Sequence, residues 1–263
     1  MFIENNGVRL HVRVDGVDHP IAPPVMLLHS LGTNLHIWDR VLALLPEHLR
    51  YVRFDQRGHG LSDVPAAPYS MGTMVSDAEA VLSALKIKDC LVVGLSMGGL
   101  VAQGLAIKRL DLVRALVLMD TAAKIGIPAV WADRIAQVRT GGLAAIVDNA
   151  MERVFSKAFR QGPELSHWRN MLLAMNPEGW MGCAAAISGT DFYTPTSGLR
   201  LPVLGLVGSE DSTTPPDLVR ETIDLIPGSK FAIIRQSGHF PPIENPMAVA
   251  EALNRFLAEI GHL

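Results

Sequence analysis

The chain has 263 residues, of which 49% are hydrophobic and 19% are charged. This hydrophobic fraction excludes a disordered chain, and the length suits one large α/β unit or two smaller domains. The net charge of −3, from 23 Lys and Arg against 26 Asp and Glu, argues against binding to a phosphate backbone, which requires a basic face.

The sequence shows no signal for a membrane or an oxidising compartment. No run approaches 18 consecutive apolar residues, and the start has no basic segment followed by an apolar one, so neither a membrane span nor a signal peptide is expected. The two cysteines, Cys90 and Cys183, cannot form a disulfide framework, and neither lies in metal-ligand spacing. We therefore expect a cytoplasmic protein with no nucleic-acid or membrane partner, either a monomer or a small homo-oligomer.

Short apolar runs alternate with helical patterns along most of the chain. Val8–Val14 alternates strictly between apolar and polar residues, which is typical of an antiparallel strand with one face in solvent. The later strands are separated by helices, and this order implies parallel pairing because a parallel crossover takes about a dozen residues. These expected strands are Val25–His29, Tyr51–Phe54, Cys90–Gly94, Ala115–Met119, Val203–Val207 and Phe231–Ile234. The expected helices are Leu35–Leu45, Met74–Leu85, Leu100–Arg109, Pro215–Ile226 and Pro246–Ile260.

The segment 121–197 breaks this alternation. Four helices without a strand cannot extend a sheet, so we expect residues 1–120 and 198–263 to form the core and 121–197 to form a helical cap, or lid, over it. The alternative is a helical layer that only adds core. The segment carries a net charge of +1 against −4 for the remainder. Its expected helices are Val130–Val138, Leu143–Phe155, Glu164–Met175 and Trp180–Ile187.

A G-x-S-x-G motif, Gly94–Gly98, provides the candidate nucleophile. It lies between an expected strand and an expected helix, where a sharp turn would hold Ser96 in a strained conformation and expose its hydroxyl above the sheet. The glycines are needed because side chains there would collide with the neighbouring strand and helix. The alternative is a glycine-rich turn with an incidental serine.

A serine hydroxyl needs a base, and the base needs an acid that orients it. His239 follows the last expected strand and so lies at the same edge of the sheet as Ser96. Asp211 follows the preceding strand and is our choice for the acid, whereas Asp120 is the second candidate because its strand also ends at this edge. For His29 and His59 a structural hydrogen-bonding role is the default expectation.

The tetrahedral intermediate of acyl transfer needs two N–H donors for its oxyanion. We assign one to the backbone amide of Met97, directly after the nucleophile. The other is assigned to the backbone amide of Leu31, in the loop after the first buried strand.

Together, these motifs identify the chain as similar to the α/β-hydrolases, and more narrowly to the 3-oxoadipate enol-lactonases of aromatic catabolism. The resemblance implies a mostly parallel central sheet flanked by helices, with a four-helix cap inserted after the sixth strand. It rests on the G-x-S-x-G motif Gly94–Gly98, on Asp211 and His239, and on five further stretches: 30–39, 54–63, 120–126, 130–134 and 177–180.

The family's substrate is a small enol-lactone that carries a carboxylate, so a cation is expected near the pocket. Trp131, Arg134 and Val138 lie on one face of their predicted helix, whereas Arg139 points away. We therefore predict Arg134 as the carboxylate ligand and Trp131 as an apolar wall of the pocket. The alternative is that Trp131 belongs to the cap core and Arg134 is solvated. Four further large apolar residues of the segment are assigned to the core: Met171, Met175, Trp180 and Met181.

These assignments predict a hydrolase that acts on a carboxylic ester bond through an acyl-enzyme and requires neither a metal nor an organic cofactor. The expected reaction opens 3-oxoadipate enol-lactone to 3-oxoadipate, and the expected partner is a small anionic lactone or ester. The same triad also serves carboxylesterases, carbon–carbon bond hydrolases and perhydrolases. A ligand sensor without catalysis is a further alternative, against which a complete triad argues.

Overall fold

The computed structural model describes residues 1–17 and 22–262. Within these residues the strands form one eight-stranded sheet in the order β1-β2-β4-β3-β5-β6-β7-β8. β1 and β2 are antiparallel to their neighbours, and all other pairs are parallel. The strands are β1 (Phe2–Asn5), β2 (Val8–Asp15), β3 (Val25–Leu28), β4 (Tyr51–Phe54), β5 (Cys90–Leu95), β6 (Val113–Met119), β7 (Val203–Gly208) and β8 (Lys230–Ile234).

Burial along the strands follows the expected chemistry. β3, β4 and β5 are buried at every position, as parallel strands covered by helices on both faces should be. β2 alternates between buried and less buried residues over most of its length, which confirms the expected antiparallel strand. β1 was not predicted, because its four residues are partly exposed and present no buried face.

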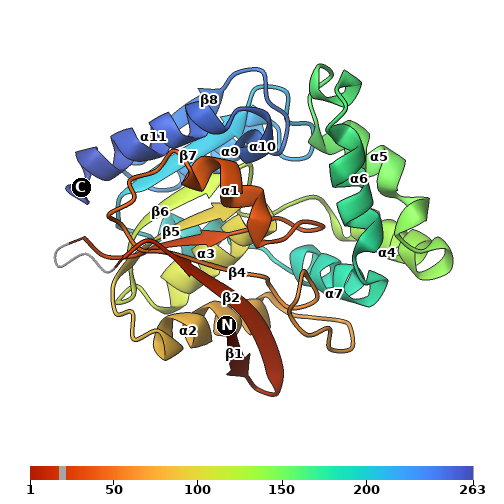
Figure 1. The fold of residues 1–263 in the computed structure, drawn as a ribbon, viewed down its shortest axis with the longest axis horizontal. Helices are drawn as coiled ribbons and strands as arrows, with labels where there is room; N and C mark the ends of the chain where they lie inside the picture. The colour runs from red at the N-terminus through yellow and green to blue at the C-terminus, as the bar shows by residue number, and fades with distance from the viewer. Residues whose placement is uncertain (18–21, 263) are drawn as a thin grey trace.

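Helices cover both faces of the sheet (Figure 1). The chain runs from β3 outward to β4 and then returns past β3 to β5, so right-handed crossovers place the helices before and after this reversal on opposite faces. Helix α2 packs on α3, and α3 packs on β5 and β6, while α11 packs against α1. These helices are α1 (Asp39–Leu42), α2 (Met71–Ala84), α3 (Met97–Lys108), α9 (Pro216–Asp224), α10 (Pro241–Glu244) and α11 (Pro246–Glu259).

The reversal of direction beside β3 determines where a ligand can bind. In an open parallel sheet, the loops after the two strands at such a point diverge to opposite faces and leave a crevice between them. Here the two strands are β3 and β5, which pair from Val25 with Leu91 to Leu28 with Gly94. The loop that carries Leu31 and the turn that carries Ser96 therefore begin next to each other.

Residues 121–197 form a helical insertion between β6 and β7, on the side of the molecule away from both termini (Figure 1). The expected helix Leu143–Phe155 is divided, because a short 3-10 helix, η2 (Leu143–Ala145), precedes α5. The helices of the insertion are α4 (Pro128–Gly141), α5 (Val147–Val154), α6 (Leu165–Ala174), α7 (Pro177–Ser188) and the short α8 (Tyr193–Ser197). A four-helix insertion after the sixth strand is thus confirmed, with α8 added at its end.

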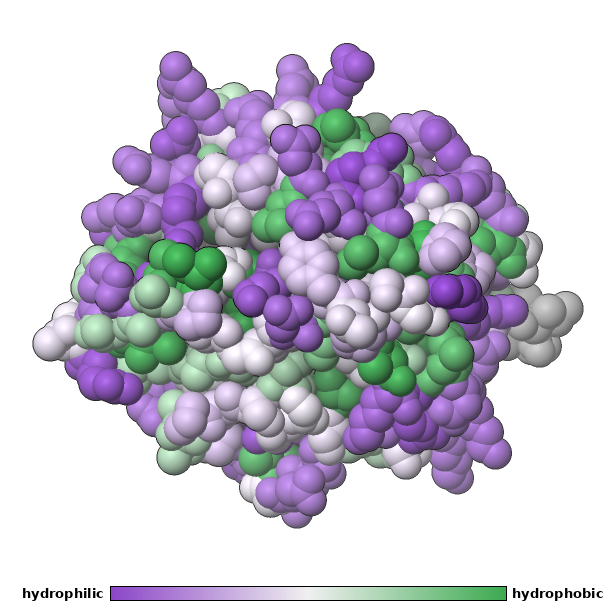
Figure 2. Space-filling model, turned by 180° about the vertical axis from the view of Figure 1, so that it is seen from behind, coloured by the Kyte–Doolittle hydropathy of each residue, from purple (hydrophilic) through white to green (hydrophobic). Residues whose placement is uncertain are grey.

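The surface combines hydrophilic and hydrophobic residues. Figure 2 shows hydrophilic side chains projecting along the upper and lower edges of one face, with hydrophobic patches scattered across its middle. The most exposed large apolar residues come from separate elements, and scattered residues of this kind are ordinary on soluble surfaces. Within the described chain, no helix combines the length and the apolar character that crossing a membrane requires.

Candidate active site

Ser96 occupies the sharp turn between β5 and α3. Its backbone is in the left-handed region, with φ of +54° and ψ of −114°, which a serine adopts only where its surroundings enforce it. Its amide donates to the carbonyl oxygen of Met119 at 2.9 Å, and its carbonyl oxygen accepts from the hydroxyl of Thr121 at 2.7 Å. These bonds hold the turn on both sides, and Ser96 lines a cavity above the sheet.

The two glycines of the motif are required by close backbone contacts. A Cβ atom on Gly94 would lie 2.3 Å from the carbonyl oxygen of Gly98, across the turn. A Cβ atom on Gly98 would lie 2.5 Å from the carbonyl oxygen of Leu28 in β3. Both obstacles are main-chain atoms, one in α3 and one in β3, that cannot move without distorting their element, so the steric reason expected from the sequence is correct.

Two backbone amides next to Ser96 are available for an oxyanion. Met97 is the first residue of α3, and Leu31 lies in the loop that follows β3. Among the residues that the structure describes, neither amide has a hydrogen-bond acceptor. Both lie at the crevice beside β3, and the amino end of α3 adds the favourable electrostatic potential of its peptide dipoles.

Two buried histidines hold the loop that carries Leu31. His59 Nε2 accepts from the Gly32 amide at 3.0 Å, and its Nδ1 lies 3.2 Å from the carbonyl oxygen of Arg57. His29 Nε2 accepts from the Gln56 amide at 2.9 Å, while its Nδ1 lies 2.8 Å from the carbonyl oxygen of Ser30. The hydrogen-bonding role expected for both residues is therefore what the structure shows.

These contacts require uncharged imidazole rings, since each Nε2 acts as an acceptor. Burial, followed by the charge of the neighbouring His29, lowers the pKa of His59 to about 3. Burial likewise lowers the pKa of His29. In the unfolded chain both rings would titrate near their ordinary value of 6.5, so acid favours unfolding between that pH and the lowered pKa.

We expect this difference to appear as a pH-dependent stability. For His59 alone, a folded pKa of about 3 against 6.5 costs about 2 kcal/mol when the pH falls from 7 to 5. Urea unfolding of the wild-type protein and of His59→Gln at the two pH values measures the difference. Glutamine keeps an acceptor for Gly32 but does not titrate, so the variant should lose less stability. Equal losses in both proteins would contradict a neutral His59.

His239 and Asp211 form a buried hydrogen-bonded pair. His239 Nδ1 lies 2.7 Å from Asp211 Oδ2, which leaves Nε2 as the acceptor on the other side of the ring. Burial alone would raise the pKa of Asp211, but the charge and hydrogen bond of His239 and the donors of Thr213 and Thr214 keep it below its ordinary value. The His239 amide donates to the carbonyl oxygen of Val154 at 2.8 Å and so attaches this loop to the insertion.

Asp120, the second candidate for the acid, lies behind this pair. Oxygen and nitrogen atoms of Asp120, Asp211 and His239 all lie within 4.8 Å of one another, but the hydrogen bond to the imidazole comes from Asp211. Asp120 accepts from the Gly208 amide at 2.8 Å. Burial and then the adjacent charge of Asp211 raise the pKa of Asp120 well above its ordinary value of 3.8, which favours the neutral form of this carboxyl group.

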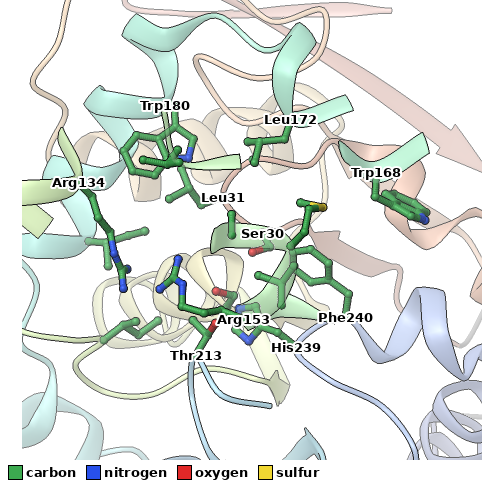
Figure 3. Close-up of a pocket in the computed structure, with 18 of the residues that line it drawn as sticks. Ser30, Leu31, Arg134, Arg153, Trp168, Leu172, Trp180, Thr213, His239 and Phe240 are labelled. Atoms are coloured by element: carbon green, nitrogen blue, oxygen red, sulfur yellow. The ribbon is translucent and has the colours of Figure 1, made fainter. Parts of the chain in front are cut away.

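Ser96 and His239 face a cavity between the sheet edge and the helical insertion (Figure 3). The cavity has an empty volume of about 710 Å³, which includes its opening to solvent. Trp131 and Arg134 line it together, as the helical spacing predicted, and the guanidinium of Arg134 stacks 4.9 Å from the Trp131 ring. Arg139, on the same helix, is exposed.

Two residues that were assigned to the core, Trp180 and Met171, also line the cavity. The core assignment is confirmed for Trp180, which is buried among the core residues, and is wrong for Met171, which is only half-buried and lies outside them. Trp180 is only 5% exposed and its ring lies 6.5 Å from that of Trp131, so it serves both as packing and as wall. A helical pattern marks an apolar face but does not distinguish a packed interior from an apolar cavity.

Arg153 also lines the cavity and was not singled out from the sequence. It lies near the end of α5, is half-buried, and points toward the same space as Arg134 (Figure 3). The net positive charge of the insertion was the only feature of the sequence that pointed to it. That charge could not distinguish Arg153 from the other basic residues among the seven in the segment.

Comparison with known proteins agrees with this geometry. A family model for the alpha/beta hydrolase fold matches residues 23–246. The 3-oxoadipate enol-lactonase 2 of Acinetobacter baylyi is 31% identical over 233 residues, which cover 88% of this chain and 87% of the relative.

Two solved structures are similar over nearly the whole chain. The enol-lactonase from Burkholderia xenovorans LB400 has a TM-score of 0.93 at 33% identity, covering 98% of this chain and 100% of that one. A thermophilic esterase from Thermogutta terrifontis has a TM-score of 0.91 at 29% identity, covering 99% and 98%. The resemblance inferred from the sequence motifs is thus confirmed, and the chain belongs to the alpha/beta hydrolase family.

Proposed function

We propose that this protein is a serine hydrolase that opens a small carboxylated enol-lactone, 3-oxoadipate enol-lactone, to 3-oxoadipate in aromatic-compound catabolism. The observation that carries the proposal is the convergence of Ser96, the Asp211–His239 pair and two unoccupied amides on one cavity that also contains arginines. The similarity to two enol-lactonases supports the choice of substrate.

In the proposed first step, His239 Nε2 takes the proton of Ser96, whose Oγ attacks the lactone carbonyl. The amides of Leu31 and Met97 bind the oxyanion. When the intermediate collapses, the bond between the acyl carbon and the ring oxygen breaks and the enol oxygen leaves with a proton from His239. The enol converts to a ketone, which makes the ring opening hard to reverse.

The second step releases the acid. The opened chain remains attached to Ser96 as an ester until His239 takes a proton from water, and the resulting hydroxide attacks the same carbonyl. The Ser96 oxygen then leaves with that proton, and the new carboxylic acid ionises. Asp211 keeps the imidazole in the orientation and tautomer that both steps need. No step in this scheme calls for a metal or an organic cofactor.

Arg134 is the proposed ligand of the substrate carboxylate, with Trp131 as the adjacent apolar wall. Burial and then the charge of Arg153 lower the pKa of Arg134 to about 10, so its guanidinium is still charged at neutral pH. We expect Arg134→Ala to reduce kcat/KM about 10- to 100-fold on the carboxylated lactone and much less on a neutral aryl ester. Steady-state kinetics on both substrates measures the ratio, and equal losses would contradict the assignment.

The direct test follows the loss of enol-lactone ultraviolet absorbance with purified protein, beside a neutral aryl ester. Faster turnover of the lactone supports the proposal, and turnover of the ester alone would favour a general carboxylesterase. The similarity to the Thermogutta terrifontis esterase makes this second function the main alternative. Labelling of Ser96 by a fluorophosphonate excludes a ligand sensor, which should react slowly or not at all.

A further inference from the structure

Two arginines in the cavity have no counterion. Within residues 1–17 and 22–262, the guanidinium groups of Arg134 and Arg153 form neither an ion pair nor a hydrogen bond, and Arg153 Nε is fully buried. The cavity lining includes no Asp or Glu among these residues. Burial lowers the pKa of Arg153, and the charge of Arg153 contributes to the lowered pKa of Arg134.

Such an arrangement is unfavourable in the free protein, because two cations share a partly dehydrated space. A buried charge normally has a partner or hydrogen bonds. In Figure 3 the two guanidinium groups point into the same part of the cavity, which His239 and Thr213 also line. The missing partner is therefore expected from the ligand and should be an anion.

Thr213 supplies a third donor at this place. Thr213 lines the cavity, and its hydroxyl is buried without a partner in the described structure, whereas its amide donates to Asp211 Oδ1 at 2.7 Å. The neighbouring Ser212 hydroxyl donates to the carbonyl oxygen of Arg153 at 2.9 Å. The loop of the triad acid and the end of α5 are thus bonded together, and they present Thr213 and Arg153 side by side.

We propose that Arg153 and Thr213, together with Arg134, form a carboxylate subsite that selects esters and lactones whose acyl part ends in a carboxylate. This inference rests on the proposed function and extends it from one cation to a three-donor site. One carboxylate oxygen would accept from the Thr213 hydroxyl and from Arg153, and the other from Arg134. The bound anion would offset the repulsion between the two positive charges. It would also accept the hydrogen bonds for which both guanidinium groups have no partner in the described structure.

A matched pair of substrates tests the subsite. Mono-4-nitrophenyl glutarate and 4-nitrophenyl butyrate share a leaving group and differ in the terminal carboxylate. For Arg153→Met we expect the ratio of kcat/KM for the glutarate over the butyrate to fall about 10- to 100-fold. Thr213→Val should lower the ratio about 3- to 10-fold, and the conservative variants Arg153→Lys and Thr213→Ser should recover part of each loss.

Arg139→Met is the control, because it removes the same charge from an exposed position of α4 that does not line the cavity. We expect its ratio to equal that of the wild type. If Arg139→Met and Arg153→Met lower the ratio equally, long-range attraction explains the preference and the subsite is wrong. An unchanged ratio in Arg153→Met and Thr213→Val overturns it as well.

Binding without turnover separates this proposal from the proposed function. In the Ser96→Ala background, calorimetric titration with glutarate should show binding that weakens at least tenfold on adding Arg153→Met. If glutarate binds equally well with and without Arg153→Met, the subsite is rejected. This holds even if Ser96 of the otherwise wild-type enzyme reacts with a fluorophosphonate, because that reaction tests the proposed function and not the subsite. Conversely, if the enzyme does not open the enol-lactone but glutarate binding depends on Arg153, the proposed function fails and the carboxylate subsite stands.

Discussion

Replacing Ser96 with alanine is expected to reduce kcat on the enol-lactone by about 10³- to 10⁶-fold. The variant removes the only atom that can carry the acyl group in the proposed scheme, while His239, Asp211 and the two amides remain. Water can still attack a lactone held in this site, so a small residual rate above the uncatalysed reaction is expected. Single-turnover and steady-state assays of the purified variant measure the loss.

The same variant should also lose fluorophosphonate labelling. Cys90→Ala is a suitable comparison, because Cys90 is a nucleophilic residue type but is buried in β5, where its thiol donates a hydrogen bond to the Leu112 carbonyl oxygen. That variant should retain labelling. A Ser96→Ala protein with a rate close to wild type would exclude the covalent mechanism and leave only direct attack by water.

Replacing Asp211 with asparagine is expected to reduce kcat by about 10³- to 10⁴-fold with a smaller change in KM. Asparagine nearly preserves the shape but no longer stabilises the imidazolium that forms when His239 takes the proton. It can also donate to Nδ1, which would place the imidazole proton on Nε2, where it blocks attack by Ser96. Comparison of kcat and KM on the lactone measures the effect.

Asp120→Asn is the matched control for this prediction. Burial and the charge of Asp211 raise the pKa of Asp120 and so favour its neutral form, which a neutral asparagine resembles in charge and shape. Its acceptor for the Gly208 amide can be kept by the asparagine oxygen. We expect a loss of less than tenfold. If Asp120→Asn were as damaging as Asp211→Asn, the assignment of the acid would be wrong.

The order of the elements was predictable because each depends on neighbouring residues in the chain. The expected strand Tyr51–Phe54 agrees at both ends, and the other core strands differ by one or two residues at an end. Such apolar runs are buried whatever their neighbours in the sheet, so the local pattern is enough to identify them as strands along the chain. The division of the predicted helix over Leu143–Phe155 and the strand β1 were missed, since packing decides both.

The proposed nucleophile, base and acid could also be selected from the chain alone. The carboxyl ends of parallel strands meet at one edge, so Ser96, Asp211 and His239 could be placed together once their strands were recognised. The choice between Asp211 and Asp120 was different, because both follow strands that end at this edge. Position in the chain and family resemblance favoured Asp211. The observation that distinguishes it from Asp120 is its hydrogen bond to His239, which is a tertiary contact that the sequence does not show.

The order of strands and helices, the glycine-bounded turn and the positions of the reactive side chains follow from local patterns, whose physical causes act over a few residues. Which cavity residues meet is a different matter. Arg153 and Thr213 are 60 positions apart in the numbering and become neighbours only because α5 packs on the loop after β7. Trp180 similarly became part of the cavity wall through packing that its own helix does not encode. Long-range contacts of this kind depend on the whole chain closing around one space, so only the folded structure shows which charged and polar groups share that space.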